Sequence, residues 1–434
     1  MSKDESRLSG ISEDLGREAL ATITAWALFC VTLMSKVPLL FEPDDYAYRA
    51  SIVALKNGLI TLSQAQYVQL NSSLKGNGLV GIYQWIHLPN GMWISQKNPG
   101  FPFLAEPFYA IGNLRLLPAF YSLVAIAGIF LGARKWLGPG GGFVASVCFL
   151  FTGASLTFGY RITMPTFTEA CLIAAALGVL LWSCSLTPKP TLKSWSSSIA
   201  FFVLGCAVFS RYTNFVIYLG VLIVLLAYRK KFGFGADAVY KWLSVTAFLV
   251  IGILCFNRHF YGGWFNTGYS GLHLYTSLAN YPKNLSQLPP LLVEAMPLML
   301  IAIWAGAQIA HRTKKQLVPP IENVDGDKRI GILLVVSVVL PWALYLGYNW
   351  TAAKLDSSSA IHVIRFYVPA LGPLAFLAAW KLMRLTLKWR VLLIALLVAS
   401  SFWSFQSLTK QTPPLPGQPG GPPLWSKTPL TKAQ

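Results

Sequence analysis

Long apolar runs alternate with short polar segments along most of the chain. Most of these runs approach the ~20 residues that a helix needs to cross the hydrocarbon core of a bilayer. The pattern predicts eleven membrane-spanning helices, at residues 19–40, 114–133, 142–159, 165–186, 195–210, 212–228, 240–257, 291–310, 329–348, 364–380 and 390–408. The predicted fold class is therefore all-α, a polytopic membrane protein.

Basic residues predict the orientation of these spans. Cytoplasmic loops of membrane proteins carry an excess of Lys and Arg. With the N-terminus in the cytoplasm, every internal cytoplasmic loop holds at least two basic residues, whereas the outer turns at Arg161 and Arg211 hold one each. An odd number of spans then places the C-terminus outside. The predicted location is the plasma (inner) membrane, with the longest loop on the outer face.

Two segments outside the spans define the predicted domain organisation. The first outer loop, residues 41–113, has helical apolar spacing in its first half, followed by aromatic residues interleaved with Pro and Gly. This pattern is typical of amphipathic helices that lie at the headgroup level. Residues 411–434 are rich in Pro and Gly, which predicts an extended tail. The chain thus divides into a membrane domain, 1–410, and this tail.

Composition agrees with a membrane protein. The chain is 54% hydrophobic and only 12% charged, whereas soluble domains have roughly 25% charged residues. The net charge of +19 would also suit nucleic-acid binding, but the basic residues cluster between apolar runs, as membrane topology requires. We therefore expect no nucleic-acid partner. The six cysteines lie in or beside apolar runs and form no CxxC motif, so they read as small buried hydrophobes.

An acidic pair, Asp44 and Asp45, follows the first predicted span. Acidic residues are scarce here, 16 in 434, and charge at the end of a span is costly unless it is solvated, paired or used. One interpretation is structural, because an Asp before an apolar helical pattern is a common N-cap. The other is a general base for a hydroxyl group, or a ligand of a divalent metal ion. The local sequence favours neither interpretation.

Other polar side chains lie at outer span ends. Singly, such residues are usually interface anchors whose charged heads reach water. Together they bring several cations to the side of the acidic pair, and a phosphate is the natural anionic partner for them. These residues are Lys97, Glu106, Arg161, Arg211, Arg258, His259 and Arg365.

The order of these features resembles a known family. The acidic pair, the long outer loop and Lys97-Asn98-Pro99-Gly100-Phe101-Pro102 are similar to the C-type glycosyltransferase superfamily. The nearest branch holds the dolichyl-phosphate-mannose–protein mannosyltransferases and the bacterial aminoarabinose–lipid A transferases. Segments 211–214, 257–269 and 365–373 also resemble motifs of that branch. Asn98 departs from the family's K-x-P-P-G pattern. The resemblance covers about residues 25–380.

The resemblance implies an inverting glycosyltransferase. The enzyme would move a sugar from a polyprenyl-phosphate donor to an acceptor hydroxyl on a lipid, a glycan or a protein. Asp44 would be the catalytic base with Asp45 beside it, or the pair would hold a divalent metal ion. Lys97, Arg258 and Arg365 would bind the donor phosphate. The predicted substrate-binding set is completed by Glu106, Arg161, His259, Tyr269 and Tyr367.

Two other functions remain open from the sequence. A transporter or flippase of lipid-linked sugars would place ionisable groups along a path through the middle of the membrane, whereas here they lie at span ends. A surface polysaccharide polymerase or ligase would use a diphosphate-linked donor and would need no acidic base, which the Asp pair argues against.

Overall fold

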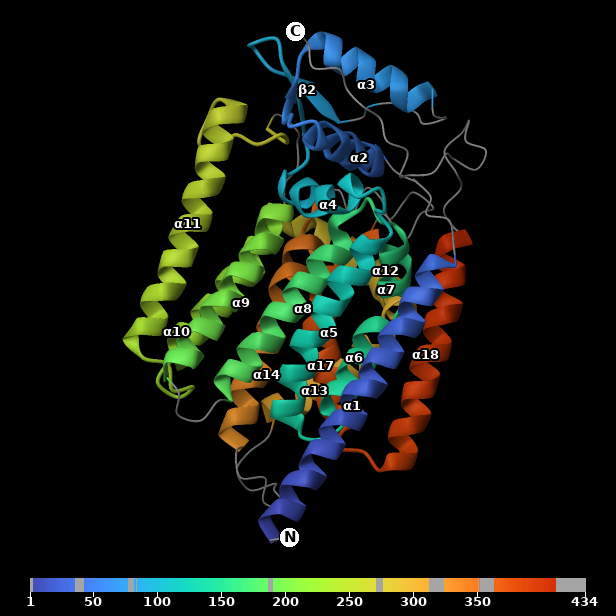
Figure 1. The fold of residues 1–434 in the computed structure, drawn as a ribbon, viewed down its shortest axis with the longest axis vertical. Coiled ribbons are helices and arrows are strands. Elements are labelled where there is room, and N and C mark those ends of the chain that lie inside the picture. Colours follow the sequence, from blue (N-terminus) through green and yellow to red (C-terminus); the bar gives the residue numbers. More distant parts are fainter. Residues whose placement is uncertain are drawn as a thin grey trace.

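The computed structural model describes residues 3–35, 43–76, 82, 84–185, 190–270, 276–311, 324–349, 351 and 363–410. Its long helices run roughly along one axis, and the segments of the first outer loop form a cap at one end of them (Figure 1). Within this part of the chain, seven helices are long and apolar enough to cross a membrane. They are α1 (Lys3–Met34), α5 (Leu116–Leu137), α8 (Pro165–Cys184), α9 (Pro190–Ser210), α11 (Ala236–Tyr261), α14 (Val324–Leu346) and α18 (Leu387–Lys410).

Two further spans would be bent pairs of helices. Helices α6 (Gly141–Leu150) and α7 (Gly153–Tyr160) meet at 59°, and α12 (Tyr281–Ala295, preceded by η2, Leu278–Asn280) meets α13 (Leu298–His311) at 109°. Shorter apolar helices cover Tyr212–Tyr228 and Val368–Leu382. These comprise η1 (Tyr212–Asn214), α10 (Phe215–Tyr228), η3 (Val368–Ala370) and α17 (Leu371–Leu382). The helical class is confirmed, whereas the count of eleven spans stays a prediction.

Two predicted spans are broken in the structure. The run at 142–159 divides into α6 and α7, and the run at 291–310 turns sharply between Ala295 and Leu298. Pro297 lies in this turn. Proline lacks an amide hydrogen and disfavours helical geometry in the residue before it, so a continuous helix breaks there.

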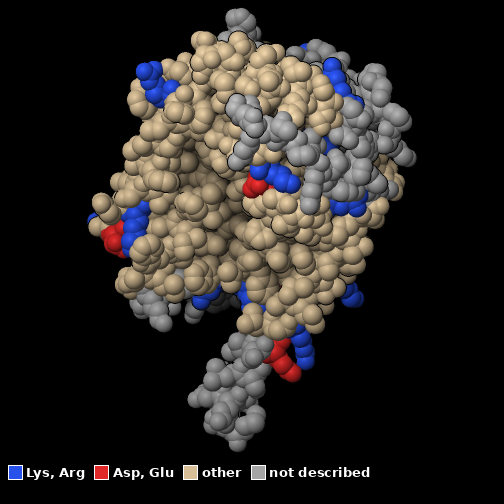
Figure 2. Space-filling view, turned by 45° about the horizontal axis from the view of Figure 1, so that its top comes forward, with Lys and Arg blue, Asp and Glu red and all other residues tan. Residues whose placement is uncertain are grey.

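The helices differ widely in how deeply they are buried. In the apolar stretch of α8, 83% of the residues are buried inside the protein, and α8 packs against both α5 and α9. In the apolar stretch of α11, only 6% of the residues are buried, and this helix packs mainly on α9 at the edge of the bundle. Much of the surface in Figure 2 carries no charged side chain. Such exposed apolar helices are stable where lipid rather than water surrounds them.

The cap contains three helices and a small sheet. Helix α2 (Pro43–Lys56) confirms the helix expected from Asp44, and it packs on α4 (Gly100–Ala110) above the bundle. Helix α3 (Gln64–Gly76) also lies in the half of the loop where apolar spacing predicted helical structure. Strands β1 (Thr61–Leu62), β2 (Trp85–His87) and β3 (Trp93–Ser95) form an antiparallel sheet in the order β1-β3-β2. The sequence analysis did not predict these strands, because two or three residues are too few to show an alternating pattern.

Candidate active site

Several segments far apart in the sequence meet around a cavity of about 480 Å³. They include the start of α2, the connection from β3 to α4, the turn between α9 and η1, the loop after α11, the end of α14 and the residues before η3. Charged and phenolic side chains that line this cavity include Asp44, Lys97, Arg211, Tyr269, Tyr345 and Arg365. All of these except Tyr345 were expected on the outer side from the sequence, and the fold brings them together.

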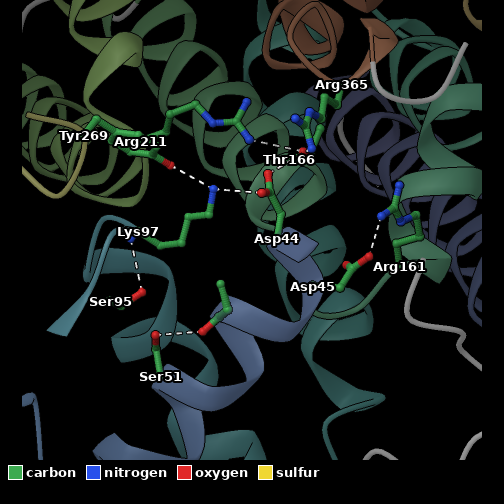
Figure 3. Close-up of polar contacts among 11 residues, drawn as sticks. Asp44, Asp45, Ser51, Ser95, Lys97, Arg161, Thr166, Arg211, Tyr269 and Arg365 are labelled. Atoms are coloured by element: carbon green, nitrogen blue, oxygen red, sulfur yellow. Dashed lines mark hydrogen bonds and ion pairs between the residues drawn. The ribbon is translucent and has the colours of Figure 1, made fainter. Parts of the chain in front are cut away.

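Asp44 lies on the cavity wall between two cations. Its Oδ1 is 2.8 Å from Lys97 Nζ, and its Oδ2 is 2.9 Å from Arg365 Nη1. The Asp44 side chain is 16% exposed, so molecules in the cavity can reach it. Figure 3 shows Asp44, Lys97, Arg211 and Arg365 pointing toward one another. The arrangement fixes the direction of the carboxylate.

Asp45 points away from Asp44 and does not line the cavity. It is fully buried, forms an ion pair with the equally buried Arg161, and accepts a hydrogen bond from Thr163 Oγ1 at 3.1 Å. Successive residues of a helix lie about 100° apart around its axis, so neighbouring side chains in α2 must diverge. Asp45 therefore ties α2 to the turn between α7 and α8. Neither aspartate precedes the helix, because α2 begins at Pro43.

Lys97 is held as an ammonium group. Its side chain is 5% exposed, and Nζ donates to the Tyr269 hydroxyl at 3.0 Å. Burial alone would lower the pKa of Lys97, but the Asp44 carboxylate and the Tyr269 hydroxyl outweigh burial and raise its pKa above the usual value. Lys97 is therefore a fixed positive charge beside Asp44.

Two glycines explain how Lys97 and Tyr269 come together. A Cβ on Gly100 would collide with the backbone of Phe209, and a Cβ on Gly268 would collide with the backbone of Gln96. These close approaches press the start of α4 against the end of α9, and the loop after α11 against the residue before Lys97. The glycine of the Pro99-Gly100 pair is thus a packing requirement of the site.

Arg211 lines the cavity; it was among the outer cations expected to meet a phosphate but not in the predicted substrate-binding set. Its Nε lies 3.4 Å from Oε1 of Glu169, which is fully buried in α8. Its Nη2 donates to Thr166 Oγ1 at 3.3 Å. Glu169 also accepts from Asn214 Nδ2 at 3.2 Å. The only signal in the sequence was an acidic residue within an otherwise apolar run.

The other predicted substrate-binding residues do not line the cavity. Arg161 is the partner of Asp45. Arg258 is exposed and donates to the carbonyl of Gly262, and His259 is exposed beside Phe260. Tyr367 is buried against Trp342 and Tyr345. Glu106 is half-buried on α4.

The acidic pair does not fit a metal ion. The carboxylates of Asp44 and Asp45 face in different directions, and each is bonded to a cation. Among the described residues, no group of three or more His, Cys, Asp or Glu side chains could hold a metal ion. We therefore derive no step through a metal ion.

Comparisons with known proteins agree with this fold. Residues 96–255 match the family model described as dolichyl-phosphate-mannose-protein mannosyltransferase. A crystal structure of ArnT from Cupriavidus metallidurans, bound to undecaprenyl phosphate, is similar with a TM-score of 0.57. The identity is 16%, over 88% of this chain and 64% of that chain. This chain has the C-type glycosyltransferase fold. The fold expected from the resemblance of its motifs is confirmed.

Two structures of an archaeal oligosaccharyltransferase show the same fold. AglB from Archaeoglobus fulgidus, in complex with an inhibitory peptide and a dolichol-phosphate, has a TM-score of 0.52 at 14% identity, over 93% of this chain and 56% of that chain. The Archaeoglobus fulgidus enzyme in complex with Zn and sulfate has a TM-score of 0.51 at 15% identity, over 92% and 54%. No curated protein matches the sequence significantly. The chain spans 54–64% of the length of these structures.

Proposed function

We propose that the protein is an inverting glycosyltransferase that uses a polyprenyl-phosphate sugar as its donor. The observation that carries this proposal is Asp44, an accessible carboxylate on the wall of a cavity of about 480 Å³, fixed between Lys97 and Arg365. Family relatives support the choice of donor, because ArnT has been solved with undecaprenyl phosphate and AglB with a dolichol-phosphate.

The chemistry is a single displacement. Asp44 accepts the proton of the acceptor hydroxyl while the hydroxyl oxygen forms a bond to the anomeric carbon of the sugar. The bond from that carbon to the phosphate oxygen breaks, and the phosphate leaves with the electron pair. Attack and departure occur on opposite faces of the sugar, so the anomeric configuration inverts. Lys97, Arg211 and Arg365 surround the cavity with positive charge, which stabilises the negative charge that develops on the leaving phosphate.

A groove beside the site suits the lipid chain of the donor. An apolar cavity of about 310 Å³ lies between α4, α9 and α11. A smaller hollow shares Phe103 and Phe256 with this groove and shares Lys97 with the catalytic cavity. The series of hollows runs from the cationic site to the exposed apolar side of α11. An isoprenoid chain in the bilayer can lie there while its phosphate reaches the cations.

We further propose that the site faces the extracytoplasmic side of the plasma (inner) membrane, with the N-terminus in the cytoplasm. This follows from the distribution of basic residues along the sequence. The transferred sugar would be a hexose or a pentose, and the acceptor a hydroxyl of a lipid, a glycan or a protein.

The proposal is tested with purified protein in detergent and a panel of radiolabelled polyprenyl-phosphate hexoses and pentoses. We expect one of these donors to lose its sugar to an added acceptor or to water in the wild type, and not in Asp44→Asn. Asp237→Asn is the matched control, because Asp237 is 62% exposed and pairs with Lys241 in α11, outside the cavity. Donor binding without turnover in all three proteins would contradict the enzyme and favour a carrier of lipid-linked sugars.

A further inference from the structure

The three cations of the cavity are not equivalent. Lys97 and Arg365 are both paired with Asp44, at 2.8 and 2.9 Å. A phosphate bound to either of these cations would share it with the carboxylate that it orients. The third cation, Arg211, pairs instead with Glu169, which is not part of the cavity wall.

The Arg211 guanidinium is held by several partners. Nε faces Glu169, Nη2 donates to Thr166, and the side chain is also hydrogen-bonded to Tyr345. Nη1 is buried and has no hydrogen-bond partner in the described part of the chain. The side chain is 15% exposed, and it lines the cavity (Figure 3). Because a guanidinium is planar and its donors point in fixed directions, anchoring two nitrogens also fixes where the third points.

Glu169 and Asn214 form the support behind this arginine. Glu169 is fully buried within a helix long enough to span the membrane, where a carboxylate is expensive unless it is paired and hydrogen-bonded. Asn214 supplies a hydrogen bond to its Oε2 at 3.2 Å and is itself anchored to the carbonyl of Ala207 at 3.0 Å. A buried ion pair of this kind adds little net stability. Its clear effect is to hold Arg211 in one orientation.

We propose that Arg211 binds the phosphate of the donor lipid, and that Glu169 and Asn214 are positioning residues that aim it. This inference rests on the proposed function for the identity of the donor. The Arg211 guanidinium, which lines the cavity and is 15% exposed, donates a charge-assisted hydrogen bond to a phosphate oxygen, while Lys97 and Arg365 continue to hold Asp44. The site therefore binds its leaving group and keeps its base oriented at the same time.

The test measures lipid binding without any sugar. Detergent-purified protein is titrated with undecaprenyl phosphate and, separately, with undecaprenol, which has the same chain but no phosphate. We expect the wild type to prefer the phosphate lipid. In the double variant Arg211→Gln/Glu169→Gln, which removes both charges and leaves neither unpaired, this preference should fall by about tenfold or more. Binding of undecaprenol should not change. Lys75→Gln, an exposed cation on α3, should match the wild type.

Two results would overturn the inference. One is a double variant that keeps the full preference for undecaprenyl phosphate, and the other is a wild type with no preference. Inorganic phosphate provides a further arm: it should compete with undecaprenyl phosphate in the wild type and compete less in the double variant. Equal competition in both proteins would place the phosphate on other residues.

Glu169→Gln alone tests the positioning role and serves where the double variant does not fold. It should weaken the preference for the phosphate lipid while leaving undecaprenol binding unchanged. A merely structural role would lower binding of both lipids alike, and that result would remove Glu169 from the inference.

These measurements are separate from the test of the proposed function, because lipid binding requires neither a sugar nor Asp44. Transfer that depends on Asp44, with a phosphate preference that does not depend on Arg211, would refute only the inference. A preference that depends on Arg211, without transfer from any donor, would refute the proposed glycosyltransferase and leave the phosphate site in place.

Discussion

Asp44 and Asp45 are adjacent, chemically identical and opposite in their surroundings. Asp44 is partly exposed in a cavity among side chains from distant segments. Asp45 is fully buried and bonded to Arg161 and Thr163. One residue of helical rotation separates a carboxylate that substrates can reach from one that they cannot. The comparison shows that two adjacent acidic residues can have separate surroundings, one open to a cavity and one paired inside the protein, so an acidic pair need not act as a unit.

The largest expected effect is on catalysis at the cavity side. Asp44→Asn should reduce transfer by about 10²–10⁴-fold, because an amide cannot take the hydroxyl proton. Folding should be affected much less than in the Asp45 variant, because water in the cavity can solvate the two released cations. Transfer rate and thermal unfolding are measured on the same preparation. Wild-type turnover in Asp44→Asn would exclude this carboxylate as the base.

The next effect is on stability at the buried side. Asp45→Asn should destabilise the protein by about 3–5 kcal/mol, because Arg161 would keep a buried charge without its counterion. The matched variant Asp45→Asn/Arg161→Met removes both charges and should recover part of this loss. Denaturant or thermal unfolding of the two variants provides the measurement. Equal stability of both variants and the wild type would show that the buried pair does not tie α2 to the bundle.

A smaller effect is expected at Lys97. Lys97→Met removes an ion pair and a hydrogen bond and should destabilise the protein by about 1–3 kcal/mol. Because the pKa of Lys97 is raised in the folded protein, its contribution is fully present below the unfolded value of about 10.4. It is lost only as the pH rises through the higher folded value. The stability difference between wild type and Lys97→Met should therefore be constant from about pH 7 to 9. A difference that grows with pH in this range would mean that the pKa of Lys97 is lowered in the folded protein.

The smallest effect is expected at Tyr269. Tyr269→Phe removes the hydroxyl that accepts a hydrogen bond from Lys97 at 3.0 Å and keeps the ring. We expect a loss of about 0.5–1.5 kcal/mol in stability and only a few-fold change in transfer rate, because the ion pair between Lys97 and Asp44 remains. A loss as large as that of Asp44→Asn would instead assign Tyr269 a direct part in the reaction.

The sequence predicted those features that depend on periodic apolar patterns or on residues close together along the chain. Apolar runs predicted the helices, and the spacing after Asp44 predicted α2, because burial in lipid or against a helix imposes a regular pattern. The break at Pro297 divides the predicted span 291–310 between α12 and α13. The strands of the cap were too short to leave a pattern.

The site could be predicted in part only. The residues Lys97, Tyr269 and Arg365 were identified because they lie in motifs at span ends, and the fold brings them to Asp44. The roles of the two aspartates could not be separated, because their partners lie far away: Arg161 is 116 residues from Asp45. The pairing of Arg211 with Glu169 depends in the same way on how α8 packs beside the end of α9. Contacts between distant segments follow from tertiary packing, which a single sequence does not display.

The most direct test of this account measures transfer rate and unfolding for Asp44→Asn and Asp45→Asn side by side, with the same donor and the same detergent. The account predicts opposite outcomes: Asp44→Asn folds and does not transfer the sugar, whereas Asp45→Asn is destabilised, and the fraction that remains folded still transfers it. A folded, stable Asp45→Asn protein without activity, beside an active Asp44→Asn protein, would contradict the account.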